Sequence, residues 1–414
     1  MNTPKGLTVI SAIIAGISTN FQIQASPLVS IGDSTDIFFN GSSSVRWISN
    51  VFRDSDSEEE DFLFTFSPGL EVNVGRGLSN TDFTIVTRYD ILRYVDLDRL
   101  NTEQLHVTAK GTYQSSRLDV SSAVSFDQEQ STTGDENVIS NDLIESDNFL
   151  VRLDGEYRFS PKFSFGAGFS YTDKEYTSFE ERLADRENLR IPFDVFYELT
   201  PKIDLSAGYT YSKADIEGVV LLGNPTSVAS SGYDRESHFF NVGFRGDVLP
   251  KLKGSVKVGY RVRDTDDSDL IVFDTNTLAV VDTGRTDRDD NGILGLDGKL
   301  TWLATPKLTT DFGLSRDFGI SGEGDSTETT SIRTTANYSI NSNWFASGEL
   351  GFTLREYTDL DREDNQYDLK LRVSYILNEY WRFSSGYGYS ENDSDLDTSS
   401  YESHSIDFTA SLRY

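Results

Sequence analysis

Hydrophobic and polar residues alternate along most of this chain. From Phe149 to Phe159 the apolar residues hold one parity, and the other parity carries Arg152, Asp154, Glu156 and Arg158. After Ser160-Pro161-Lys162, apolar residues return at every second position. A period of two is that of a β-strand, whose successive side chains point to opposite faces. The stretch therefore predicts a hairpin with one apolar and one polar face.

The same alternation recurs along the chain and predicts eighteen strands. Most have room for about 9–11 residues, the length of a tilted strand that crosses a bilayer. An even number of such strands predicts an all-β fold, a transmembrane antiparallel up-and-down β-barrel of about 18 strands. The predicted strands are Ile37–Trp47, Phe62–Val74, Phe83–Ile91, Leu105–Tyr113, Leu118–Phe126, Phe149–Phe159, Phe163–Tyr171, Leu189–Leu199, Ile203–Tyr211, Phe240–Val248, Leu252–Val262, Leu294–Ala304, Leu308–Leu314, Thr330–Ile340, Trp344–Leu354, Tyr367–Leu377, Trp381–Tyr389 and His404–Tyr414.

The connections between these strands alternate in length. Long acidic stretches such as 53–61, 213–236 and 264–292 lie between short turns. Short turns at one end and long loops at the other are typical of an outer-membrane barrel, whereas a soluble sandwich is not expected to separate its loops by length. The longest two could also fold inward and plug a lumen. The short turns contain Ser160-Pro161-Lys162, Thr200-Pro201-Lys202, Leu249-Pro250-Lys251, Thr305-Pro306-Lys307, Asn341-Ser342-Asn343 and Asn378-Glu379-Tyr380.

Two prolines, Pro68 and Pro192, fall inside predicted strands. Proline has no N–H to donate to a ladder, so we expect a bulge or locally broken pairing at each.

Composition supports a barrel more than a thick soluble core. Only 37% of the 414 residues are hydrophobic, below the globular norm of about 45–50%, yet there are 20 Tyr and 27 Phe. Abundant aromatic residues suit the girdles of a membrane barrel. The net charge of −30 argues against nucleic-acid binding, which needs a basic footprint. Without cysteine, disulfides and thiolate metal sites are excluded.

Both ends of the chain suggest export to the cell outer membrane. Residues 1–25 have the charge, apolar stretch and small-residue order of a secretory signal peptide, which leaves 26–414 as the barrel domain. The last strand ends on Tyr414 and is similar to the signal read by the barrel-assembly machinery of Gram-negative bacteria. We expect periplasmic termini, extracellular acidic loops, and contact with outer-membrane lipid and lipopolysaccharide.

Residues 36–75 resemble a known family. The resembling features are Asn50-Val51-Phe52, an acidic gap, Asp61-Phe62-Leu63 and the Ser67-Pro68-Gly69-Leu70 run. In these the chain resembles the start of the putative beta-barrel porin 2 family. The resemblance implies an outer-membrane barrel, in several members associated with export of extracellular or capsular polysaccharide, and hence polysaccharide-export components as partners. It supplies no catalytic residues.

Candidate chemistry in the sequence is sparse. The three histidines, His106, His238 and His404, have no Gly-x-Ser-x-Gly motif or other nucleophile arrangement beside them, so we predict no enzyme. Asp287, Asp289 and Asn291 match the first half of a calcium loop, but Gly298 stands where a bidentate Glu is needed. The sequence therefore suggests one cofactor, calcium or another divalent ion bound at the acidic loops. The alternative is that these loops are solvated and bind no specific ion.

The polar strand faces would line the lumen. Besides the four charged residues before Ser160, one strand carries a basic row of Lys253, Lys257, Arg261 and Arg263. A turn symmetric about Pro250 would place Lys253 opposite Asp247, Lys257 opposite Gly243 and Arg261 opposite Phe239. The row is either a cationic track for anionic solute or a structural ladder of salt bridges, with Asp297 as a possible partner on the other side.

Barrels of 16–18 strands can leave an aqueous channel. The sequence therefore favours a porin-like hydrophilic passage, which could serve polysaccharide export. The alternative is a non-conducting surface or scaffold barrel that binds a partner through its acidic loops.

Overall fold

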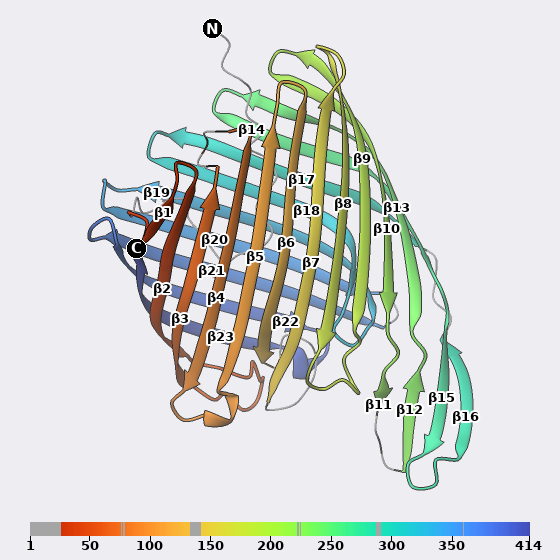
Figure 1. The fold of residues 1–414 in the computed structure, drawn as a ribbon. Coiled ribbons are helices and arrows are strands. Elements are labelled where there is room, and N and C mark those ends of the chain that lie inside the picture. Colours follow the sequence, from red (N-terminus) through yellow and green to blue (C-terminus); the bar gives the residue numbers. More distant parts are fainter. Residues whose placement is uncertain are drawn as a thin grey trace.

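The computed structural model describes residues 26–75, 77, 79–132, 142–221, 223, 225–286, 291–358 and 360–414. Eighteen antiparallel strands follow one another around a closed barrel (Figure 1), which confirms the predicted fold class and strand number. The barrel strands are β2 (Thr35–Ile48), β3 (Asp61–Val74), β4 (Thr81–Tyr94), β5 (Thr102–Gln114), β6 (Leu118–Thr132), β7 (Leu143–Arg158), β8 (Phe163–Tyr176), β9 (Arg186–Thr200), β10 (Ile203–Ile216), β13 (Tyr233–Leu249), β14 (Leu252–Thr265), β17 (Asn291–Thr305), β18 (Leu308–Ile320), β19 (Ser326–Ser339), β20 (Trp344–Tyr357), β21 (Arg362–Ile376), β22 (Trp381–Ser394) and β23 (Tyr401–Arg413).

Closure comes from pairing between the first and last barrel strands. β23 runs antiparallel to β2, from Asn40 opposite Arg413 to Ile48 opposite Ser405. A closed ladder satisfies the backbone N–H and C=O groups that lipid cannot hydrogen-bond. The short strand β1 (Val29–Ile31) folds back on the start of β2. In the described part of the chain no helix is long and apolar enough to cross a membrane.

The strands extend further toward the long loops than the alternation predicts. β7 begins at Leu143 rather than Phe149, and β13 begins at Tyr233 rather than Phe240. Beyond the apolar band both faces of a strand meet water or polar groups, so the period-two signal ends while the hydrogen-bonded ladder continues. The apolar pattern therefore marks the lipid-facing length of a strand and not its full length.

Pairing is interrupted on one side of each strand proline, as expected. The β3–β4 register runs from Phe66–Ile91 directly to Gly69–Arg88, which omits Pro68. The β8–β9 register likewise omits Pro192, while that residue keeps its partner on β10. Neither interruption shifts the register, so the missing N–H costs a local ladder bond and no bulge forms.

Five of the six short turns share one side-chain cap, and the turn at Leu249-Pro250-Lys251 is the exception. The Oγ atoms of Ser160, Thr200 and Thr305 each accept from the N–H two residues on, at 3.2–3.3 Å, and from the N–H three residues on, at 3.0 Å. Asn341 and Asn378 do the same through Oδ1 at 2.9 Å. Such local bonds make Ser, Thr and Asn favourable at turn starts, which explains why these turns look alike in sequence.

Two long loops form a sheet of their own outside the barrel. Its strands are β11 (Val220–Leu221), β12 (Thr226–Ser230), β15 (Ser268–Asp274) and β16 (Val280–Thr286). Figure 1 shows it extending away from the long-loop end of the wall. The described parts of these loops therefore do not plug the lumen. At the β15–β16 turn, N–H groups of Asn276 and Thr277 and the Thr277 hydroxyl donate to Asp274, which lowers the pKa of that carboxyl.

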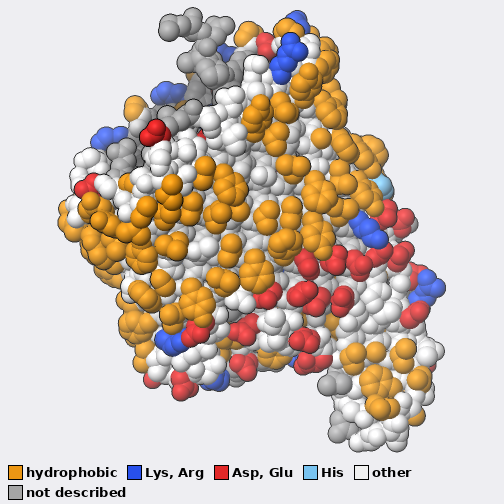
Figure 2. All heavy atoms as spheres, viewed as in Figure 1, with side chains coloured by type: hydrophobic (Ala, Val, Ile, Leu, Met, Phe, Trp, Pro, Cys, Tyr) orange, Lys and Arg blue, Asp and Glu red, His pale blue; other side chains and the backbone are white. Residues whose placement is uncertain are grey.

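The outer wall carries a broad apolar band, visible in Figure 2. Its side chains come from the outward parity of each strand, for example Phe62, Phe64 and Phe66 of β3 and Leu153 of β7, all exposed. Acidic residues border the band on the long-loop side (Figure 2). An apolar belt on the outside of a closed barrel is the surface that a bilayer covers.

Candidate functional site

The charged residues of β7 lie on the inner face of the wall. Their parity is opposite to that of the exposed Leu153. Arg152 Nε donates to Asp154 Oδ2 at 2.6 Å, and Arg158 Nη2 donates to Asp119 Oδ2 at 2.6 Å. All the charged β7 candidates therefore lie on the inner face, and Arg152, Asp154 and Arg158 are paired with near neighbours.

The basic row of β14 also faces inward. Its register with β13 places Lys253 opposite Asp247, Lys257 opposite Gly243 and Arg261 opposite Phe239, which confirms the register expected from a turn symmetric about Pro250. On the other side, β17 places Asp297 opposite Lys257.

The ion pairs of this row, however, join β14 to strands that are not its neighbours in the sheet. Lys257 Nζ lies 2.7 Å from Asp194 Oδ1 of β9, with β10 and β13 between the two strands. Arg261 Nη1 lies 2.9 Å from Asp317 Oδ1 of β18, beyond β17. Arg263 is buried, with its guanidinium 4.7 Å from the Phe318 ring.

A third pair completes what we call the charge seam, the inner-wall contacts Arg245–Glu156, Lys257–Asp194 and Arg261–Asp317. Arg245 of β13 binds Glu156 of β7 through Nη1 and Nη2, both at 2.7 Å, across three intervening strands. The wall must therefore curve tightly between β7 and β18. Gly208 of β10 leaves room for Asp194 to reach Lys257, since a Cβ at Gly208 would lie 2.2 Å from Asp194 Oδ1.

Elsewhere the inner wall is exposed to solvent. The inward side chains of Arg88, Lys370 and Arg333 are 51%, 51% and 57% exposed. Arg46 and Lys110 are also inward and exposed. Long cations stay this exposed inside a wall only where water fills the space beside them. In the part of the chain that the structure describes, the lumen is therefore open beside β2–β5 and β19–β21 and narrowed along the charge seam.

The three histidines are each held by neighbouring side chains. His106 faces inward between Asp127, 2.9 Å from Nδ1, and Asp90, 3.3 Å from Nε2. His238 and His404 face outward, each with a tyrosine hydroxyl near Nδ1, from Tyr209 at 2.8 Å and Tyr387 at 2.9 Å. These contacts are those expected of residues in the wall and in an aromatic girdle.

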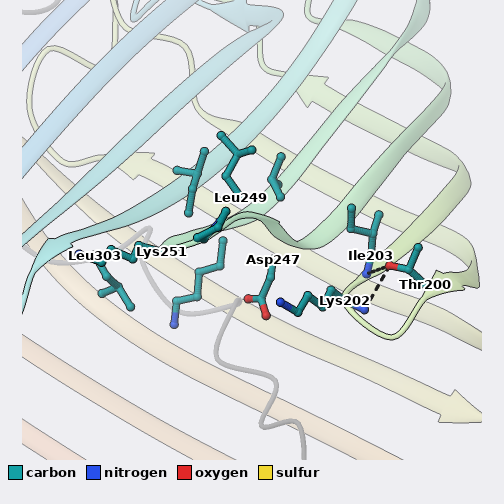
Figure 3. A pocket seen from close by; sticks show the side chains of 11 residues that line it. Thr200, Lys202, Ile203, Asp247, Leu249, Lys251 and Leu303 are labelled. Carbon is teal, nitrogen blue, oxygen red and sulfur yellow. Dashed lines mark hydrogen bonds between the residues drawn. The ribbon is translucent and has the colours of Figure 1, made fainter.

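A cavity of about 430 Å³ opens at the short-turn end, between the β9–β10 and β13–β14 turns. In Figure 3 the Lys202 side chain extends toward Asp247, and Lys251 lies beside them. Lys253 also lines the cavity. The cavity is open to solvent, and its basic groups are the lysines that line it, Lys202, Lys251 and Lys253.

The calcium-loop residues lie mostly outside the described ranges. Asp287 and Asp289 belong to that part, and the metal hypothesis for them stays a prediction. Asn291 begins β17, where Nδ2 donates to Glu328 Oε1 at 2.6 Å and Oδ1 accepts from the Gly292 N–H. Within the described ranges no three or more His, Asp or Glu side chains are grouped to hold a metal ion.

Sequence reasoning missed the partners of the charge seam. These partners are Asp194, Arg245 and Asp317. Each stands at a polar position of its strand's alternation, so the alternation could have placed its side chain on the inner face. Their pairing could not be read from neighbouring registers, because the contacts join strands that are not adjacent.

Comparison with known proteins finds one family model that matches part of the chain and several solved structures of low sequence identity. The family model described as putative beta-barrel porin 2 matches residues 288–414. No curated protein matches the chain. The match lies at the opposite end from residues 36–75, and it is consistent with the resemblance seen in them.

Solved structures with a similar arrangement include transporters and receptors. The FrpB iron transporter from Neisseria meningitidis is 10% identical, with a TM-score of 0.45, over 87% of this chain and 62% of that one. The siderophore receptor PiuA from Acinetobacter baumannii is 8% identical, with a TM-score of 0.44, over 91% and 82%. The chain thus spans 62% of the length of FrpB. At these identities and TM-scores the likeness carries no information on ligand or mechanism.

A closed antiparallel barrel with an apolar outer belt and charged residues on its inner face is the architecture of a porin-like outer-membrane protein. In its C-terminal part, residues 288–414, the chain matches the putative beta-barrel porin 2 family.

Proposed function

We propose that the barrel is a non-enzymatic passage for hydrophilic solutes across the outer membrane. The observation that carries this proposal is the exposure of the inward cations Arg88, Arg333 and Lys370, which marks a water-filled inner wall. A lumen lined by charges of both signs favours polar solutes and excludes apolar ones. No metal or other cofactor is required for such a role.

Polysaccharide export is the narrower form of this proposal. It rests on what the resemblance of residues 36–75 to the family implies, and the match of the family model to residues 288–414 supports that resemblance. In this form the periplasmic end would meet polysaccharide-export components. A second candidate is a non-conducting scaffold, which the exposed apolar residues Leu278, Val280 and Val281 on the projecting sheet favour as a contact surface for another protein.

The proposed orientation has periplasmic termini and short turns, with the long acidic loops outside the cell. Its support is the row of outward carboxylates at the loop side, where Glu187 stands opposite both Asp173 and Asp215. Like charges directly opposite one another destabilise a sheet. Divalent ions shared with lipopolysaccharide phosphates would offset that repulsion. Biogenesis would use the barrel-assembly machinery, which reads the strand ending at Tyr414.

The conductance prediction concerns two exposed lumen cations. The purified barrel is expected to conduct in planar bilayers, and Arg46→Glu/Lys110→Glu should shift the reversal potential toward cation preference, because two fixed charges in the lumen change sign. Lys162→Glu, in a turn outside the lumen, is the control and should leave the potential unchanged. Folded protein without conductance would contradict a passage and favour the scaffold.

The orientation prediction uses the β15–β16 turn. An epitope inserted after Leu278, which is exposed in the turn between β15 and β16, should bind antibody on intact cells. The same epitope inserted after Pro161 in a short turn should bind only after the outer membrane is permeabilised. Labelling with the reverse pattern would invert the orientation.

A further inference from the structure

Four arginines from three strands converge at the loop-side end of the lumen. They are Arg186 and Arg190 of β9, Arg235 of β13 and Arg261 of β14, and all have inward parity. We call them the arginine cluster. Arg190 Nη1 lies 3.5 Å from Asp317 Oδ2, and Arg261 Nη1 lies 2.9 Å from Asp317 Oδ1.

The other two members of the cluster bind backbone. Arg186 Nη1 donates to the Ser321 carbonyl oxygen at 2.9 Å, and Arg235 Nη1 donates to the Gly319 carbonyl oxygen at 2.7 Å. These carbonyls neutralise no charge. Both side chains thus hold the end of β18 in place while keeping a full positive charge beside the lumen.

The cluster carries more positive than negative charge. Across the described ranges, Asp317 is the one carboxylate in contact with the four guanidinium groups. The charges of Arg186 and Arg263 repel Arg235, and that of Arg190 repels Arg261, while Asp297 as well as Asp317 attracts Arg261. Arg235 and Arg261 are buried, so water screens this repulsion poorly. A bound anion would relieve it.

Arg190 is the member of the cluster that a solute can reach, since its side chain is 42% exposed. Its contact with Asp317 is long, which leaves guanidinium donors directed elsewhere. In the ladder, Arg190 stands between Ser170 of β8 and Ser212 of β10, both on the inner face. A guanidinium between two hydroxyl donors matches the oxygens of a carboxylate or phosphate.

From this arrangement we infer that Arg190, Ser170 and Ser212 form a binding site for the oxyanion group of a solute, with Arg186, Arg235 and Arg261 supplying a fixed positive field. Asp317 competes with the solute for Arg190. The inference deepens the proposed passage and rests on it only for the route by which the solute arrives. The shared chemistry is an oxyanion, from either an acidic sugar or a phosphorylated solute.

Titration calorimetry on the purified full-length barrel in detergent tests this site. The probes are a galacturonate hexamer, inorganic phosphate and neutral maltohexaose. We expect at least one anion to bind, and Arg190→Gln to weaken it about tenfold or more, because a hydrogen bond to a charged group is lost. Asp317→Asn should tighten binding severalfold by removing the competing carboxylate. Preference for the hexamer would assign acidic sugars, and preference for phosphate would assign phosphorylated solutes.

The two variants change binding in opposite directions, which general misfolding cannot do. Lys110→Gln, an inward lysine outside the cluster, is the matched control and should bind as the wild type does. Equal binding of maltohexaose, an unchanged Arg190→Gln, or weaker binding by Asp317→Asn would each overturn the site. A wild type that conducts and binds neither anion would overturn the site and leave the proposed passage intact. Anion binding without conductance would overturn the passage and leave the site intact.

Discussion

Replacing Glu156 with alanine is expected to lower the free energy of unfolding by about 3 kcal/mol, the low end of the range for breaking a buried ion pair. The Glu156 side chain is only 8% exposed and accepts from both Nη atoms of Arg245 at 2.7 Å and from Ser164 Oγ at 2.6 Å. Without it, the Arg245 charge stays in the wall with Asp204, 3.1 Å away, as its remaining carboxylate. Urea unfolding in lipid vesicles, followed by tryptophan fluorescence, measures the loss.

Asp154→Ala is the matched control for Glu156→Ala. It removes a carboxylate from the same face of the same strand, but its partner Arg152 is well exposed. Exposed pairs contribute about 0–1 kcal/mol, so this variant should unfold nearly as the wild type does. The double variant Glu156→Ala/Arg245→Met should recover part of the loss, because no unpaired charge remains. Similar losses for Glu156→Ala and Asp154→Ala would mean that the charge seam does not hold the wall.

Leu153→Arg is expected to impair membrane assembly. Leu153 points outward from the apolar band, with Ser122 and Phe169 as its cross-strand neighbours. An arginine at the lipid-facing midplane of a barrel costs about 2–4 kcal/mol. The folded fraction, measured by the gel shift between unheated and boiled samples, should fall accordingly.

Ser121→Arg provides the comparison on the inner face. Ser121 has inward parity and stands opposite Asp154 on β7, so a new arginine there would meet water and a carboxylate. It should assemble at close to the wild-type level. If both arginines were tolerated equally, or if only the inner one prevented assembly, the assignment of the two faces would be wrong.

The amino-acid sequence by itself determines the strands, their faces and much of their register. Period-two alternation marks each lipid-facing segment because one side of a strand meets lipid and the other meets water. Short turns such as the one at Pro250 fix the register of the hairpin that they join, which is why Lys253 opposite Asp247 was predictable. These features depend on residues close together in the chain.

The tertiary structure alone decides which inward charges meet. Arg245 reaches Glu156, and Arg190 reaches Asp317, across several intervening strands. Those contacts depend on how tightly the closed wall curves, a property of the whole barrel that no single hairpin encodes. The same holds for residues 213–236 and 264–292, whose apolar segments could have entered the lumen. Their described parts pair instead with each other outside it, because four short strands together satisfy backbone groups that neither loop could satisfy alone.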